Sequence, residues 1–420
     1  MFELTSSVAA PFALALVLSL VLVPVARALA TRLGYVSKPR EDRWNKRPVA
    51  MFGGAAIAGS LFICVTLFHV YRELAVLAGG AAFMFAVGFV DDVLSLKPAT
   101  KLIAQIAGAS LLLFFGYRLN WLHSNTLDTI LTLVWVVGMT NAFNLLDNMD
   151  GLCGGIATIA GVTIVASLLP VPFGSLASAQ ARYVMALIGA TAGFLVYNVY
   201  PAKIFMGDSG SLLLGLSFAA LTLSSPGQTL SRGDLLPIVV TPVLVLLIPI
   251  LDTTLVAISR IVSGRSTAVG GRDHSSHRLV AMGLSERTAV MMLWLLAATG
   301  GAVGVAVRRS GSGWSSLLAA LFFLGMSLFA VYLGRIRVYD EADTKALTEG
   351  KITPLVADFL YKRRVAEVLL DFCLVSIAYY AAYRLRFEGD EWALQARILI
   401  RSLPVVLAVQ LVALDRKSVV

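Results

Sequence analysis

Long apolar stretches of about 20 residues recur along the whole chain and are separated by short polar segments. A helix of about 20 apolar residues crosses the roughly 30 Å hydrocarbon layer of a membrane. The stretches lack the alternation that a soluble core shows, and in lipid the backbone must satisfy its own hydrogen bonds. The pattern therefore predicts an all-α polytopic membrane protein. The predicted spans are 8–29, 51–70, 74–90, 102–117, 127–145, 155–169, 183–199, 211–224, 236–258, 288–306, 314–334, 366–383 and 396–414.

Composition and charge agree with this interpretation, because 58% of the 420 residues are hydrophobic and only 14% are charged. The first span follows only Glu3 and precedes a basic segment, so we expect the N-terminus on the outer side. It has no basic leader and no cleavage site, so we do not expect a signal peptide. In this orientation 23 of the 34 Lys and Arg residues lie in predicted cytoplasmic loops. The net charge of +9 therefore follows from topology and gives little support for nucleic-acid binding.

The order of the spans suggests three parts. About eleven spans form a membrane domain over residues 1–335, a polar linker covers 336–365, and a two-helix hairpin lies within 366–420. The three cysteines are far apart, so they provide no disulfide framework and are expected to act as small apolar side chains.

Four polar clusters lie at the predicted cytoplasmic ends of the spans. The first consists of Asp91 and Asp92, followed by Lys97 and Lys101. Adjacent carboxylates repel unless a cation or a proton lies between them, and such coupling can produce a general base. The alternative is a polar loop in which the aspartates only cap helices.

The second cluster places Asn141, Asn144, Asp147 and Asp150 at a spacing of three, followed by Gly151. On a helix each step of three residues turns about 300°, so the four side chains would wind along one face and line a cavity. Amides and carboxylates suit a nucleoside base, ribose hydroxyls or a hydrated metal, and the glycine would let a ligand approach the backbone. The alternative is a hydrogen-bonded seam between helices.

The third cluster, GDSGS, places Asp208 immediately before an apolar helix. A helix N-terminus favours anions such as phosphate, and Mg²⁺ is typically held by one or two carboxylates together with substrate phosphates. An aspartate at this position also makes an ordinary helix cap.

The fourth cluster, RDHSSHR, contains His274, His277 and Arg278. Arginine pairs well with phosphate oxygens, so we expect a pyrophosphate site rather than a zinc site, which would need further ligands. A solvated basic loop is the alternative. Asp252, in PILDTT, is the remaining intramembrane acid; it either belongs to the site or bonds only the two threonines that follow it.

Taken together, the motifs DD…K, NxxNxxDxxDGL, GDSGS and DHxxHR resemble those of the polyprenyl-phosphate N-acetylhexosamine-1-phosphate transferases over roughly residues 8–335. The resemblance implies transfer of a sugar 1-phosphate from a UDP-linked amino sugar to undecaprenyl phosphate, with release of UMP. It implies Mg²⁺, with Mn²⁺ as a substitute, and a site on the cytoplasmic face of the bacterial cytoplasmic membrane that supplies cell-envelope polysaccharide synthesis. It leaves a homodimer open.

We considered one alternative branch of the family and one alternative class of protein. The stretches PAKIFMGDSGS, PILDTT and DHSSHR resemble the N-acetylglucosamine branch more than the phospho-N-acetylmuramoyl-pentapeptide transferases. A transporter would place polar groups near the membrane midplane and show an internal repeat, and neither is evident in the sequence.

The resemblance also implies roles for individual residues. Asp208 would bind magnesium, with Asp150 contributing, and Asp91 would act as general base toward the lipid phosphate. Lys101 matches the family lysine better than Lys97. The implied catalytic group is Asp91, Asp92, Lys101, Asp147 and Asp150. The implied substrate contacts are Asn141, Asn144, Lys97, His274, His277, Arg278 and Asp252.

The chain departs from the family pattern at three places. Asn148 lies where relatives often have glycine, so the tight turn that glycine allows is absent. Ser276 lies where a third histidine is common, and Trp44 and Asn45 precede the basic pair of the first cytoplasmic loop where a histidine is frequent. The tail resembles the membrane hairpin of polysaccharide-synthesis proteins that modify nucleotide sugars; a docking pair and two lipid-filling helices are the alternatives.

Overall fold

The computed structural model describes residues 2–37, 48–122, 124–168, 176–223, 235–262, 273–310 and 313–336, and isolated positions at 271 and between 379 and 406. Apart from those isolated positions, the predicted linker and C-terminal hairpin lie outside the described residues, as does the basic segment around Trp44.

Helices make up almost all of the described chain. In order they are α1 (Phe2–Leu33), α2 (Gly53–Leu67), α3 (Tyr71–Leu94), α4 (Pro98–Phe114), α5 (Asn125–Leu146), α6 (Leu152–Leu168), α7 (Leu176–Asn198), α8 (Gly207–Leu221), α9 (Leu235–Val245), α10 (Leu247–Val262), α11 (Ser275–Ala281), α12 (Glu286–Ser310) and α13 (Gly313–Gly334). Strands β1 (Val36–Ser37) and β2 (Val49–Ala50) pair antiparallel, with Val36 opposite Ala50 and Ser37 opposite Val49.

This architecture confirms the prediction of an all-α polytopic membrane protein. Among the described residues, six helices are long and apolar enough to cross a membrane, or seven if one bent pair is counted as a single span. The number of spans and the outer position of the N-terminus remain predictions.

The span predicted over 236–258 consists of two helices, α9 and α10, that are bent by 78° and form either one broken span or a re-entrant loop. Pro249 explains the break. A proline has no N–H to donate and its ring clashes with the carbonyl four residues earlier, here that of Val245, so Pro249 favours a kink or break at this point. Helix α9 accordingly ends at Val245.

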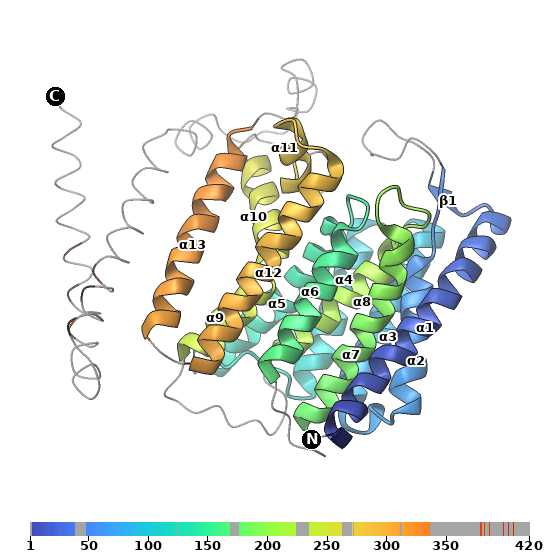
Figure 1. Ribbon diagram of the computed structural model, residues 1–420, viewed down its shortest axis with the longest axis horizontal. Coiled ribbons are helices and arrows are strands. Elements are labelled where there is room, and N and C mark those ends of the chain that lie inside the picture. The colour runs from blue at the N-terminus through green and yellow to red at the C-terminus, as the bar shows by residue number, and fades with distance from the viewer. Residues whose placement is uncertain are drawn as a thin grey trace. The chain divides into compact units, whose positions relative to one another are not determined.

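The chain divides into two compact units, residues 1–254 with 274–309, and residues 255–273 with 310–420. In the first unit, α1 to α8 run side by side as a bundle (Figure 1). Helix α8 packs against α3, α5 and α2, while α7 packs against α1, α6 and α2. In the second unit, Arg260 Nε donates a hydrogen bond to Asp273 Oδ2 at 3.0 Å.

Glycines allow the helices to approach α8 closely, as small residues do in membrane bundles. A Cβ added at Gly88 of α3 would collide with the Asp208 backbone, and one at Gly54 of α2 would collide with the Gly210 backbone. From α8 itself, Gly215 lies against the Thr140 backbone of α5. These contacts set the distances between the helices that carry the polar clusters.

We expect Gly88→Ala to lower the stability of the protein by about 1–3 kcal/mol, because the new methyl group overpacks a backbone contact that cannot relax. The matched control is Gly79→Ala in the same helix, where a Cβ meets nothing within 4 Å. Thermal unfolding in detergent compares the two variants. An equal melting temperature for both would contradict the close α3–α8 contact.

Candidate active site

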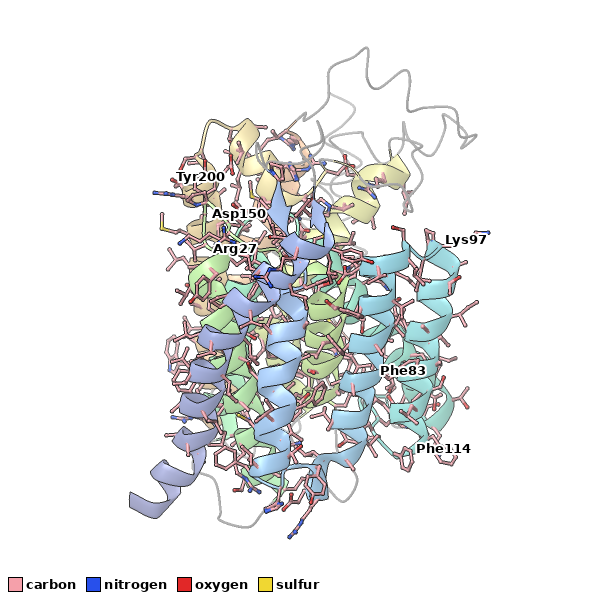
Figure 2. All side chains as sticks on the ribbon, turned by 90° about the vertical axis from the view of Figure 1, so that its right-hand side faces the viewer. Arg27, Phe83, Lys97, Phe114, Asp150 and Tyr200 are labelled. Atoms are coloured by element: carbon pink, nitrogen blue, oxygen red, sulfur yellow. The ribbon has the colours of Figure 1, made fainter. Side chains whose placement is uncertain are left out.

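One lysine joins two carboxylates from separate helices. Lys101 Nζ of α4 lies 2.9 Å from Asp91 Oδ2 of α3 and 2.7 Å from Asp208 Oδ2 of α8. The Leu96 N–H donates to the second oxygen of Asp91 at 2.6 Å. All three charged side chains are partly buried, so the ammonium is the counter-ion of two acids that would otherwise repel. Lys97, by contrast, is exposed at the N-cap of α4 and lies at the outer edge in Figure 2.

The adjacent Asp91 and Asp92 do not share one cation, because the two carboxylates have different hydrogen-bond partners. Asp92 caps α8: its oxygens accept from Asp208 N at 2.8 Å and from Ser209 N at 3.0 Å. Gly207 opens the helix with a φ of 75°, and a side chain there would meet the Asp92 carboxylate. The start of α8 thus already has an internal anion, the Asp92 carboxylate, and binding of a substrate phosphate there remains a prediction.

The predicted stripe of four polar side chains on one helix holds only for its first half. Helix α5 ends at Leu146, Asp147 is its C-cap, and Asp150 lies in the following turn. Gly151 then takes a φ of 78°, a conformation that glycine adopts without strain. The chain therefore turns where the spacing of three predicted a continuing helix.

The two asparagines on α5 have different surroundings. Asn144 Nδ2 donates to Ser211 Oγ at 3.0 Å, which joins α5 to α8 one turn after Asp208. Asn141 instead exchanges two hydrogen bonds with Gln105 of α4, at 2.7 and 3.1 Å. Asn141 therefore takes part in a hydrogen-bonded seam between helices, which was the alternative to a cavity-lining role. Gln105 was missed, although a glutamine one turn after Lys101 in an apolar stretch could have indicated it.

Hydrogen bonds connect the turn after α5 to the segment that precedes Asp208. Asp150 Oδ2 accepts a hydrogen bond from Ala202 N at 2.8 Å. Asn198, which the motifs did not include, accepts from Gly151 N at 3.0 Å and donates to Ile204 O at 2.9 Å. Burial raises the pKa of the Asp150 carboxyl, and the Ala202 hydrogen bond partly offsets this. The roles of Asp147 and Asp150 toward nucleotide or metal remain predictions.

The fourth motif forms the short helix α11 where a loop was expected. Asp252 of α10 fixes its start: one oxygen lies 2.8 Å from His274 Nδ1, and the other accepts from Ser275 N and Ser275 Oγ at 2.7 and 2.6 Å. The expectation that Asp252 bonds only its neighbouring threonines is therefore wrong. Asp252 is 1% exposed and its carboxylate orients His274, whereas its contact with substrate remains a prediction.

The described residues of this motif, 273–278, are buried, so this part of the chain is not a solvated basic loop. His277 and Arg278 are 5% and 3% exposed, and the His274 and His277 rings lie 6.0 Å apart. Ser276 Oγ donates to Asn148 Oδ1 of the turn after α5 at 2.8 Å. Contact of this helix with a diphosphate remains a prediction.

The polar clusters gather toward one end of the bundle. In Figure 2, Lys97, Asp150 and Tyr200 lie toward one end, whereas Phe114 lies at the other. The described residues contain no group of three or more His, Cys, Asp or Glu side chains arranged to hold a metal ion. The Asp208 carboxylate nevertheless fits magnesium, because this ion commonly takes one or two carboxylates and completes its shell with substrate phosphates and water.

Comparison with known proteins supports the resemblance drawn from the motifs. The model of glycosyl transferase family 4 matches residues 74–225. A probable undecaprenyl-phosphate N-acetylglucosaminyl 1-phosphate transferase of Bacillus subtilis is 30% identical over 365 residues, which cover 84% of this chain and 96% of the relative. A decaprenyl-phosphate N-acetylglucosaminephosphotransferase of Mycobacterium tuberculosis is 32% identical over 345 residues, 74% of this chain and 82% of the relative.

A second group of relatives is more distant. A phospho-N-acetylmuramoyl-pentapeptide-transferase of Bacillus anthracis is 28% identical over 331 residues, 70% of this chain and 95% of the relative. The matches thus extend well beyond the motifs and cover most of the described bundle. The chain therefore belongs to glycosyl transferase family 4, the family of polyprenyl-phosphate N-acetylhexosamine-1-phosphate transferases that its four motifs resemble.

Proposed function

We propose that this protein transfers N-acetylglucosamine 1-phosphate from UDP-N-acetylglucosamine to undecaprenyl phosphate at the cytoplasmic face of the bacterial cytoplasmic membrane, and so initiates cell-envelope polysaccharide synthesis. The names of the two nearer relatives support the acceptor class and the sugar. The observation that carries the proposal is the cluster in which Lys101 joins Asp91 and Asp208. Such a cluster at the end of a membrane bundle suits a reaction between a lipid phosphate and a water-soluble nucleotide.

In the proposed reaction an oxygen of the lipid phosphate attacks the phosphorus that bears the sugar. A new P–O bond forms, the bond to the phosphate of UMP breaks, and UMP leaves with the electron pair. A proton on the attacking phosphate would pass to Asp91, the partly buried acid of the cluster. Both substrates are anionic, so Lys101 and the buried Arg278 would offset the repulsion between their phosphates.

Asp208, with Asp150 contributing, would hold Mg²⁺, or Mn²⁺ in its place, while Asp91 serves as the base. The bound ion would neutralise phosphate charge in the transition state. Lys101 Nζ donates to Asp208 Oδ2, so its ammonium would have to release that oxygen for it to become a ligand. Asp92 keeps Asp208 in place by capping α8, and Asn144 ties the same helix to α5.

A donor panel tests this function. The purified protein in lipid nanodiscs with undecaprenyl phosphate and Mg²⁺ is given UDP-N-acetylglucosamine, UDP-N-acetylgalactosamine or UDP-N-acetylmuramoyl-pentapeptide, and UMP and lipid product are measured. We expect UDP-N-acetylglucosamine to give the highest kcat/KM. A preference for the muramoyl-pentapeptide donor would replace the proposal with that alternative, and no UMP from any donor would refute both.

A further inference from the structure

Asn148 of the turn after α5 and Ser276 of helix α11 are in contact. Neither side chain has a role in the proposed chemistry. The Ser276 hydroxyl donates to Asn148 Oδ1 at 2.8 Å, and Asn148 Nδ2 donates to Leu145 O at 2.8 Å. Both ends of the Asn148 amide are therefore engaged, which fixes its orientation. Ser276 is fully buried, and 128 residues separate it from Asn148 along the chain.

The contact lies between residues that are candidates for binding the donor. Asn148 lies between Asp147 and Asp150 in the sequence, and Ser276 directly precedes His277. Helix α11 has only seven residues, and so short a helix does not hold its position without tertiary contacts. One such contact runs from Asp252 to the start of the helix. The contact with Asn148 is a second one, and it runs to the acidic turn.

We propose that Asn148 and Ser276 act as a positioning pair that sets the spacing between the turn after α5 and α11, and thereby the affinity for the donor nucleotide. This inference rests on the proposed function, because the donor concerned is UDP-N-acetylglucosamine. Neither residue is assigned contact with the reacting phosphorus. They act through the acidic side chains that flank Asn148 and through the basic side chains that follow Ser276.

Exchanging the two residues tests the pair. Asn148→Ser alone leaves two short hydroxyls that do not meet, and Ser276→Asn alone places two amides in the space of one. The double exchange restores one amide and one hydroxyl with the same total volume. We expect each single variant to raise the KM for UDP-N-acetylglucosamine about tenfold, with a smaller change in kcat, since a buried polar group loses its partner. The double variant should recover to within about threefold of the wild-type KM, because coupled sites are not additive.

The matched control is Ser60→Ala. Ser60 is as buried as Ser276, but its hydroxyl bonds only the Ala56 carbonyl of its own helix, so the KM should not change. A double variant whose KM shows the product of both single effects would overturn the pair, and so would single variants that lower kcat while KM stays constant.

Failure of the proposed function can be told apart from failure of the pair. Wild-type protein that releases no UMP would refute the function. Thermal unfolding of the same four proteins then tests the contact without turnover. Recovery of the melting temperature in the double variant would support the contact, whereas additive losses would overturn it.

Discussion

Replacing Asp208 with asparagine should lower kcat by about a thousandfold while the protein still folds. The substitution keeps the size of the side chain but removes the charge that Lys101 Nζ contacts at 2.7 Å. It also removes the α8 carboxylate that would hold a metal ion, and an amide oxygen is a much weaker ligand. The backbone cap from Asp92 does not depend on the Asp208 side chain, so α8 should begin at the same residue.

The matched control for Asp208→Asn is Asp128→Asn. Asp128 is also a first-turn acid of a helix, and it accepts hydrogen bonds from Trp121 N at 3.1 Å and Leu122 N at 2.9 Å. These contacts lie at the connection between α4 and α5, at the end of the bundle marked by Phe114 (Figure 2). The control should lower stability without changing the kcat of the folded protein. Full activity in Asp208→Asn would remove Asp208 from the catalytic centre.

Replacing Lys101 with methionine should lower kcat/KM about a hundredfold and make the stability of the protein depend on Mg²⁺. Without the ammonium, Asp91 and Asp208 face each other uncompensated, and adjacent carboxylates destabilise each other. A divalent cation in the same place would relieve this repulsion. Added Mg²⁺ should therefore raise the melting temperature of Lys101→Met more than that of the wild type, a readout that does not require turnover.

The control for Lys101→Met is Lys203→Met, which removes an exposed lysine from the loop before α8. Its melting temperature should respond to Mg²⁺ as that of the wild type does. If Lys101→Met loses activity but shows no added stabilisation by Mg²⁺, the lysine contacts substrate only, and the two acids are not the place where the metal binds.

The sequence predicted the helices well because each span in lipid must satisfy its own backbone, and a long apolar run has no other stable structure. Helices occupy the predicted ranges from 8–29 to 314–334. Among the described residues, the break between α9 and α10 could have been anticipated, since a proline such as Pro249 kinks or breaks a helix. Helix α11 was missed because it is short and its residues are polar, so it carries no apolar periodicity.

The composition of the site could be predicted more readily than its pairings. Asp91 and Asp92 are adjacent, yet neighbouring side chains on a helix point about 100° apart, so one reaches Lys101 and the other the start of α8. Chain adjacency suggested a cation or proton shared between the two carboxylates, whereas helix geometry gives each its own partner. The tie between Asp252 and His274 depends on how distant helices pack, which no local pattern encodes.

The turn after α5 is held at Asp150 by Ala202 and at Gly151 by Asn198. The conformations of the connections between α5 and α6 and between α7 and α8 therefore depend on each other. An insertion in either would pull these partners out of register and shift the approach to Asp208. In related chains, length variation should be confined to segments without such ties, and these two connections should change length together.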